Sequence, residues 1–241
     1  MPVPNLKKNV KKILKPVAKI VASILVWIIL FTQNRIVKSN RSYLPALLAS
    51  LCFNDSLVFK IDPRLLKYHV HDPDILPGNL FVWPGDWDKE VVPLNEHEKF
   101  VIARELFVEN KDCTSTTFYK YAVSQMEKGC SVKRGDITLD SLDNISRYFK
   151  KQERLFEEIK NGGFDLSLAP ETGAVIARDG SIIHFRQGHH TLAIVKILGV
   201  ENVILRIRAV HSIWLSNQVK GKGLFLIKAV KRSFKELAML E

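Results

Sequence analysis

The sequence predicts an α+β fold: a small mixed β-sheet with helices packed on it, a helical insertion, and basic amphipathic helices at both ends of the chain. Three observations support this prediction. Signals for a hairpin, a helix and a strand follow one another within 174–211, helix signals recur between about 94 and 160, and both ends combine lysines with apolar residues. We expect a main domain over 42–215, between an N-terminal segment, 1–41, and a C-terminal helix, 216–241.

The sheet is predicted mainly from residues 174–211, which read AVIARDGSIIHFRQGHHTLAIVKILGVENVILRIRAVH. Two β-rich segments, 174–177 and 181–185, flank an Asp-Gly pair, which indicates a hairpin because glycine readily takes positive φ. Apolar residues at helical spacing follow and end at a glycine: Leu192, Val195, Leu198 and Gly199. The β-branched stretch 203–210 predicts another strand.

The turn between hairpin and helix is a candidate anion site. Gly188 lets the backbone approach a ligand closely, and the first amides of a helix attract phosphate. His189, His190 and Thr191 can donate hydrogen bonds from the first helical turn, and Arg186 just before the glycine can reach a phosphate. The same residues also fit a plain glycine bend followed by a helix whose first turn is polar.

This turn and helix resemble the ParB/sulfiredoxin-like superfamily, specifically its uncharacterised proteins with a domain like the N-terminal domain of ParB. Those proteins usually read G-(R/H)-H-R-L-A-I-A-K-x-L-G. The matching positions here are Gly188, His190, Leu192, Ala193, Ile194, Lys196, Leu198 and Gly199. Upstream, 154–164 resembles the helix that precedes the hairpin in the superfamily, and 85–88, Gly-Asp-Trp-Asp, resembles a feature of the closer relatives. The resemblance implies a small mixed β-sheet of ParB/sulfiredoxin type.

Three departures narrow what the resemblance implies. His189 stands where sulfiredoxins carry a reactive cysteine, so sulfinic-acid repair is not supported. Only Gly188 remains of the Gly-Glu-Arg-Arg turn of chromosome-segregation ParB proteins, which argues against a CTP-gated DNA clamp. Thr191 replaces an arginine that is usual in the closer relatives, which removes a bidentate phosphate ligand.

The superfamily includes nucleotide hydrolases, ATP-dependent reductases and small-molecule kinases. The resemblance therefore implies a nucleotide or phosphorylated small molecule bound at Gly188–Thr191, with ATP or another nucleotide and Mg²⁺ as cofactor, and a phosphotransferase or nucleotide hydrolase activity. Whether the chain is an enzyme stays open, and the sequence names no catalytic base. The alternatives are a non-catalytic nucleic-acid-binding protein of ParB type and a membrane-docked scaffold without a ligand.

Other polar residues of the same run are secondary candidates. Arg178 and Asp179 lie in the hairpin turn, which by itself accounts for Asp179, and His211 follows the last strand. Arg206 and Arg208 share one face of that strand, so they form either a solvated face or a pair that faces a ligand.

A metal site is not predicted. Residues 69–74, His-Val-His-Asp-Pro-Asp, hold four potential ligands, but no second cluster at a recognisable spacing completes them. Residues 69–88 are expected to form a loop with a strand-like stretch at 79–83. The cysteines Cys52, Cys113 and Cys130 are widely spaced and fit neither a zinc nor a disulfide pattern, which favours a reducing compartment.

The insertion is expected to contain three helices. Asn95 and Glu98 have the spacing of a capping box, and Gly129 and Gly162 are stop signals. The expected bounds are Asn95 to Val108, Thr114 or Ser115 to Gly129, and about Ser141 to Lys160.

Charge is concentrated at the two ends of the chain. Residues 1–41 hold nine Lys or Arg and no acid, and 202–241 hold eight basic and two acidic residues, against nineteen basic and twenty-three acidic residues between them. The apolar run 20–31 is shorter than a membrane span requires, and it carries basic residues on both sides. We expect residues 1–41 to contact an anionic membrane surface, as a peripheral or monotopic segment at the cytoplasmic face. An ordinary core helix with a basic tail is the alternative.

The C-terminal stretch 223–241 alternates apolar and basic residues at helical spacing, and the expected amphipathic helix fits a membrane surface, an acidic partner or docking on the core. The basic composition also allows nucleic-acid binding, which the acidic centre of the chain and the lack of a helix-turn-helix make the less favoured partner. The sequence does not specify the substrate, the oligomeric state or whether 17–31 spans or lies on a membrane.

Overall fold

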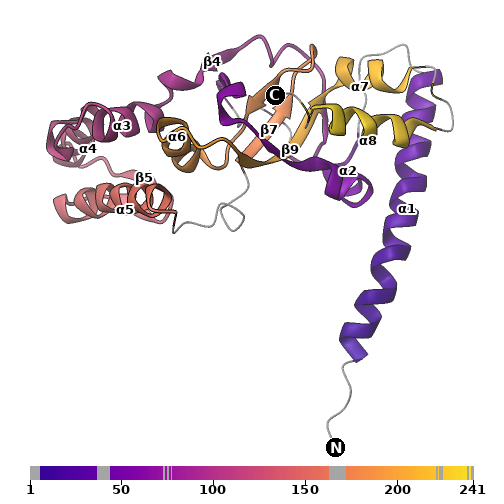
Figure 1. Cartoon of the computed structure of the whole chain (residues 1–241), viewed down its shortest axis with the longest axis horizontal. Helices are drawn as coiled ribbons and strands as arrows, with labels where there is room; N and C mark the ends of the chain where they lie inside the picture. Colours follow the sequence, from indigo (N-terminus) through magenta and orange to yellow (C-terminus); the bar gives the residue numbers. More distant parts are fainter. Residues whose placement is uncertain are drawn as a thin grey trace, which may run out of the picture.

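The computed structural model describes residues 6–36, 44–72, 78–162, 172–220 and 225–237, together with Asp74, Leu76, Lys222 and Met239. Side chains of the first helix are described for 16–31. The described chain is α+β, with a mixed sheet at its centre, a helical lobe at one end and a long helix that projects from the other end (Figure 1).

Seven described strands form the central sheet in the order β1-β9-β7-β8-β2-β4, with β3 paired to the end of β9. Their bounds are β1 (Val58–Ile61), β2 (Tyr68–Val70), β3 (Val82–Trp83), β4 (Val91–Pro93), β7 (Thr172–Ile176), β8 (Ile182–His184) and β9 (Val203–His211). The β7–β8 hairpin is antiparallel, β7 and β9 are parallel, and β1 pairs antiparallel with β9. The predicted hairpin and last strand are therefore confirmed.

A β-bulge interrupts the pairing of β7 and β9. Ala174 lies opposite Ile207, but the next residue, Val175, lies opposite Ala209, so Arg208 is an extra residue in β9. Bulges re-aim side chains and recur beside functional sites. Here the bulge places Arg208 next to Ala209 on one face of the sheet.

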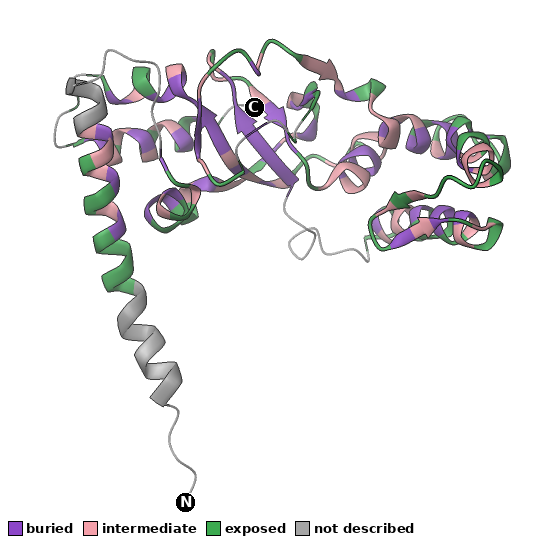
Figure 2. Ribbon diagram, turned by 180° about the vertical axis from the view of Figure 1, so that it is seen from behind, coloured by how far each residue is buried: buried purple, intermediate pink, exposed green. Residues whose placement is uncertain are grey.

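Helices cover one face of the sheet and form most of the main core. Their bounds are α1 (Leu6–Ile36), α2 (Ala46–Phe53), α3 (Glu98–Phe107), α4 (Thr117–Glu127), α5 (Leu142–Lys160), α6 (His189–Ile197), α7 (Ser212–Val219) and α8 (Leu226–Leu237). β7 is buried along its whole length, as expected of a strand that is covered on both faces (Figure 2).

The helical insertion has a hydrophobic cluster of its own. It contains α3, α4, α5 and a small hairpin, β5 (Val132–Arg134) with β6 (Ile137–Leu139). The residues buried in this cluster are Ile102, Leu106, Phe118, Ala122, Ile137, Leu139, Ile145, Tyr148 and Phe149. The insertion meets the rest of the protein mainly where α3 and α5 pack on α6 (Figure 1).

Two predicted helix caps were wrong and one was right. The N-cap of α3 is His97, whose Nδ1 accepts from the Lys99 amide, and not Asn95. Thr116 caps α4 in place of Thr114 or Ser115, because Cys113–Ser115 form a separate 3-10 turn capped by Asp112. The cap of α5 at Ser141 is confirmed.

The expected loop over 69–88 contains sheet residues. β2 pairs in parallel with β8, with His69 opposite His184, and antiparallel with β4. Only Val82–Trp83 of the strand-like stretch 79–83 forms a strand. A three-residue strand between Pro-rich segments gives too weak a periodic signal to be found from the sequence.

The two basic ends have different structures. α8 buries Leu226, Val230, Phe234 and Leu237, so its apolar face docks on the core, which was one of the three expected possibilities. Its expected start at Gly223 and the end of the chain lie outside the described residues, as do 1–5 and 37–41. Within the described part of the chain, no helix is both long and apolar enough to cross a bilayer.

Candidate functional site

Segment 184–190 joins β8 to α6 through a tight turn. Gly188 is the N-cap of α6 with a φ of 87°, and a Cβ on it would lie 2.9 Å from Oγ1 of Thr172. Gly173 is also closely packed, because a Cβ there would overlap the carbonyl oxygen of Phe185. The two glycines let the turn lie against β7, and this packing alone accounts for the glycine at position 188.

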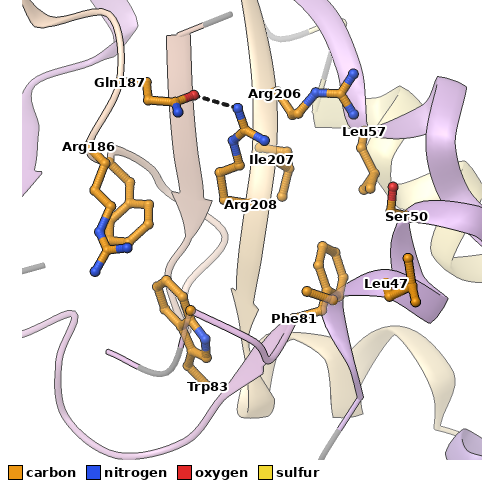
Figure 3. A pocket seen from close by; sticks show the side chains of 13 residues that line it. Leu47, Ser50, Leu57, Phe81, Trp83, Arg186, Gln187, Arg206, Ile207 and Arg208 are labelled. Carbon is orange, nitrogen blue, oxygen red and sulfur yellow. Dashed lines mark hydrogen bonds between the residues drawn. The ribbon is translucent and has the colours of Figure 1, made fainter. Parts of the chain in front are cut away.

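Arg186 has a left-handed backbone conformation, with a φ of 61°. This conformation costs energy for a residue other than glycine, and it is concentrated at functional sites. Its guanidinium lies 5.0 Å from the ring centre of Phe185, and its Nη2 donates to Oδ1 of Asp74 at 3.1 Å. The turn thereby holds the Arg186 side chain at the edge of a pocket (Figure 3).

We call this cavity the arginine pocket. It has a volume of about 480 Å³ and lies between α2 and the part of β9 that contains the bulge. Its lining residues are Ala46, Leu47, Ser50, Leu57, Gly78, Phe81, Trp83, Phe185, Arg186, Gln187, Arg206, Ile207 and Arg208. Arg208 donates to Oε1 of Gln187 at 2.6 Å (Figure 3). The described lining contains three guanidinium groups and no carboxylate.

Four histidine rings touch on the other side of the turn, and we call them the histidine cluster: His69, His97, His184 and His189. The ring of His189 stacks on His97 at 4.1 Å between centroids and meets His184 edge-on at 4.1 Å. His97 meets His69 edge-on at 4.7 Å. The cluster therefore joins β2, β8, α6 and the N-cap of α3.

The histidine cluster is neutral at physiological pH. Burial lowers the pKa of His97 from 6.5 to about 4, that of His184 to about 3 and that of His189 to about 2, and the neighbouring histidines add to these shifts. Burial lowers the pKa of His69 as well. A charged imidazolium beside three other rings, away from water, is unfavourable.

His190 faces the insertion rather than the arginine pocket. Its ring meets the Tyr148 ring edge-on at 5.9 Å, and burial lowers its pKa to about 3. Lys99, which is largely buried, donates to the Tyr148 hydroxyl at 3.2 Å and to Oε1 of Glu98 at 2.6 Å. Glu98 also accepts from Arg134. Side chains of the insertion thus cover the first turn of α6.

The Gly-Asp-Trp-Asp stretch at 85–88 binds the hairpin turn. The Arg178 guanidinium donates to Asp88 and Asp86, each at 2.6 Å, and to the Gly85 carbonyl oxygen at 3.1 Å. Burial by itself raises the pKa of Asp88, but the hydrogen bonds from Arg178 outweigh it and lower that pKa. His211 contacts the Gly85 carbonyl oxygen at 2.8 Å. These contacts give Arg178 and His211 a structural role. Asp179 accepts a hydrogen bond from the Ser181 amide within the turn.

The structure does not assemble a metal site from the described residues. No group of three or more His, Cys, Asp or Glu side chains among them is placed to hold a metal ion. In the histidine cluster His97 and His189 stack face to face, which does not direct their nitrogen lone pairs at a common point. The run at 69–74 is divided, because His69 is buried in the cluster whereas His71, Asp72 and Asp74 are exposed.

Comparisons with known proteins give no relative. No protein-family model, no curated protein and no solved structure matches this chain. What is established is an α+β fold with a mixed sheet, and the function has to be argued from the site itself.

The predicted site residues divide between the two sides of the turn. Arg186 lines the arginine pocket, whereas His189 contacts the histidine cluster and His190 contacts the insertion. The sequence signalled Arg206 and Arg208 as a pair on one face, and the structure places both in the lining. Phe81, Trp83 and His97 had no such signal, because they come from distant segments, and His184 had none although it lies at the end of the neighbouring strand β8.

Proposed function

We propose that this protein binds a phosphorylated small molecule, of the nucleotide class, in the arginine pocket beside Gly188. The observation that carries the proposal is the convergence of Arg186, Arg206 and Arg208 on one cavity. Guanidinium groups bind phosphate oxygens in a bidentate manner, and they stay charged at any physiological pH.

The rest of the lining suits the remainder of such a ligand. Phe81, Trp83 and Phe185 offer aromatic faces, and the amide of Gln187 offers a hydrogen bond. A volume of about 480 Å³ lies within the range of small-molecule sites. The strained backbone of Arg186 supports the proposal, since such strain persists where it serves a site.

As part of the same proposal, the chain belongs to the ParB/sulfiredoxin-like superfamily and catalyses phosphotransfer or nucleotide hydrolysis with ATP and Mg²⁺. The resemblance at Gly188–Leu198 supports it. The proposed ligand position is the arginine pocket, and no longer the first turn of α6, where the sequence had placed it. No side chain is assigned as a catalytic base. Nucleic-acid binding is less favoured, because the arginines line a pocket of small-molecule size.

A thermal-shift screen of the full chain tests this function. The probes are ATP, ADP, CTP, GTP, phosphate and pyrophosphate, each with and without Mg²⁺. We expect at least one of them to raise Tm, and the rise to be lost in Arg208→Gln. Arg154→Gln is the matched control, because Arg154 is exposed on α5. A screen in which no probe raises Tm, or in which Arg208→Gln keeps the full rise, contradicts the proposal.

A specific observation favours a second function, attachment to an anionic membrane at the cytoplasmic face. α1 buries Ala22, Val26 and Leu30 against the protein, and its opposite side exposes only aliphatic residues over the described stretch 17–28. This stripe consists of Val17, Ile20, Val21, Ile24, Leu25 and Ile28, each at least 42% exposed. The preceding lysines provide charge complementarity with anionic lipid.

Flotation of the full chain with lipid vesicles tests this attachment. We expect binding to vesicles that contain phosphatidylglycerol and weaker binding to pure phosphatidylcholine. Ile24→Gln should weaken binding, whereas Leu142→Gln, at a position on α5 that is equally exposed at 54%, should not. Equal binding by the two variants, or a dimer in light scattering that only Ile24→Gln disrupts, would instead assign the stripe to another role.

A further inference from the structure

Five of the seven histidines of the chain lie around the start of α6. Four of them form the histidine cluster, in which three ring pairs have centroids 4.1 to 4.7 Å apart. His190 lies next to the cluster along α6. Neither the proposed ligand site nor the attachment of α1 to a membrane uses this group.

The cluster crosses the contact between the insertion and the rest of the protein. His97 belongs to the insertion as the N-cap of α3, whereas His69 and His184 lie opposite each other on neighbouring strands and His189 begins α6. The insertion has its own hydrophobic cluster, which separation from α6 leaves intact, whereas Phe100, Ala103 and Ile159 are buried in the main core and would become exposed.

Hydrogen bonds identify the tautomer of three of the rings. Nδ1 of His69 donates to the Val70 carbonyl oxygen at 3.0 Å, and Nε2 of His184 donates to the Gln187 carbonyl oxygen at 2.9 Å. Nδ1 of His97 accepts from the Lys99 amide at 3.2 Å. A second proton on His97 would therefore remove the cap of α3, and a second proton on His184 would lie on Nδ1, which is fully buried and has no partner among the described residues.

The charged groups around the cluster do not offset added positive charge. Glu98 of α3 is the carboxylate that acts on the cluster, and it already binds Lys99 and Arg134. The other groups that face these rings are Lys99 of α3, Arg134 of β5, Tyr148 and Lys151 of α5, His190 of α6 and His71 beside β2. Protonation is therefore opposed for as long as the insertion stays docked.

We infer that the histidine cluster is a proton-sensitive latch, which holds the helical insertion on α6 at neutral pH and releases it in mild acid. Release exposes the rings to water, where histidine takes up a proton below its ordinary pKa. It also uncovers the first turn of α6. The latch is independent of the proposed ligand, because it involves only groups of the chain itself.

Linkage gives the expected size of the effect. A single histidine that is released and charged changes the opening equilibrium by about 5-fold between pH 6.5 and 5.5, and two such histidines change it by about 30-fold. Because the cluster contains four rings, we expect a change of at least about 30-fold. Opening should affect α3 and α6 while the pairing of β7 with β9 stays protected.

Hydrogen exchange of the full chain tests the latch. Amide protection in α3, α6 and β9 is measured at pH 7.5, 6.5 and 5.5, and each rate is corrected for the intrinsic pH dependence of exchange. We expect protection in α3 and the first turns of α6 to fall at least about 30-fold between pH 6.5 and 5.5, with β9 less affected. A fall of about 5-fold or less, or an equal loss in all three segments, overturns the inference.

Two variants identify the responsible groups. His97→Asn keeps an N-cap acceptor and removes the titrating ring, and His189→Phe keeps an aromatic ring without the charge. Each should reduce the pH dependence of protection in α3 by about 5-fold. Arg154→Gln is the control, because the Arg154 side chain is 81% exposed on α5 and pairs with Glu158, and it should leave the dependence unchanged. An undiminished dependence in both cluster variants also contradicts the latch.

Discussion

The two sides of the turn at Gly188 have opposite chemistry. On one side Arg186 and Gln187 line a cavity with two further arginines, where charge is retained. On the other side His184 and His189 pack into a cluster that stays neutral because it is buried. A segment of six residues, 184–189, supplies both.

The difference shows how residue type and burial together decide a role. Arginine keeps its charge in almost any environment, so it suits a site that must attract phosphate. Histidine loses its charge when it is buried at neutral pH, so rings at a helix N-terminus do not by themselves make an anion site. The sequence resemblance marks the turn, but it does not say which side of the turn faces a ligand.

The largest expected effect concerns the turn itself. Gly188→Ala should lower the free energy of unfolding by about 3 kcal/mol, because it combines a positive φ with a contact on Thr172. Gly199→Ala is the matched control at the other end of α6: it has a φ of 67° but nothing within 4 Å of its Cβ. We expect that change to cost about 1 kcal/mol. Chemical denaturation measures both, and equal costs would show that the contact with Thr172 is unimportant.

The next effect concerns the link between 85–88 and the hairpin turn. Asp88→Asn should lower the free energy of unfolding at pH 7 by about 2 kcal/mol, because it removes the charge that accepts from Arg178. The pKa of Asp88 is lowered in the folded protein, so its contribution is present above the ordinary value of 3.8 and is lost as pH falls through the lower value. The difference between wild type and variant should therefore shrink below about pH 4.

Denaturant unfolding at several pH values measures this difference. If the difference in free energy of unfolding between wild type and Asp88→Asn shrinks already between pH 7 and 5, the loss is not due to Asp88, because free histidines titrate in that range. This measurement separates the acid response expected of Asp88 from the one proposed for the histidine cluster.

The smallest effect is expected on the outer surface of the insertion. Arg154 and Glu158 form an i,i+4 pair on α5, and the Arg154 side chain is 81% exposed. Water screens such a pair, so Arg154→Gln should not shift Tm measurably. A clear fall in Tm would mean that α5 depends on its surface charges more than its buried face suggests, and Arg154 would then not serve as the control for the ligand screen.

Local signals predicted the elements whose residues are close together in the chain. The Asp-Gly hairpin, the helix that ends at Gly199 and the strand after it are all confirmed. The hairpin at 132–139 was missed although its Gly135 has a φ of 62°, because both of its strands are only three residues long. Caps were misplaced where a histidine took the role that asparagine usually has.

The two sides of the turn could be predicted only in part, because they depend on distant segments. His97 reaches His189 across 92 positions, and no local pattern links them. Arg206 and Arg208 could be placed on one face by alternation, but the bulge at Arg208 and the position of α2 opposite them come from tertiary packing. The role of Asp88 as the partner of Arg178 likewise required the fold.

The most direct test of the account is calorimetric titration of the full chain with ATP and with pyrophosphate, each with Mg²⁺, in two variants. We expect Arg208→Gln to raise Kd at least about 10-fold, whereas His190→Ala should change Kd by less than about 2-fold. The reverse pattern would place the ligand at the first turn of α6 and contradict the assignment of the arginine pocket. Heats that do not differ from buffer dilution in the wild type would contradict phosphate recognition on either side of the turn.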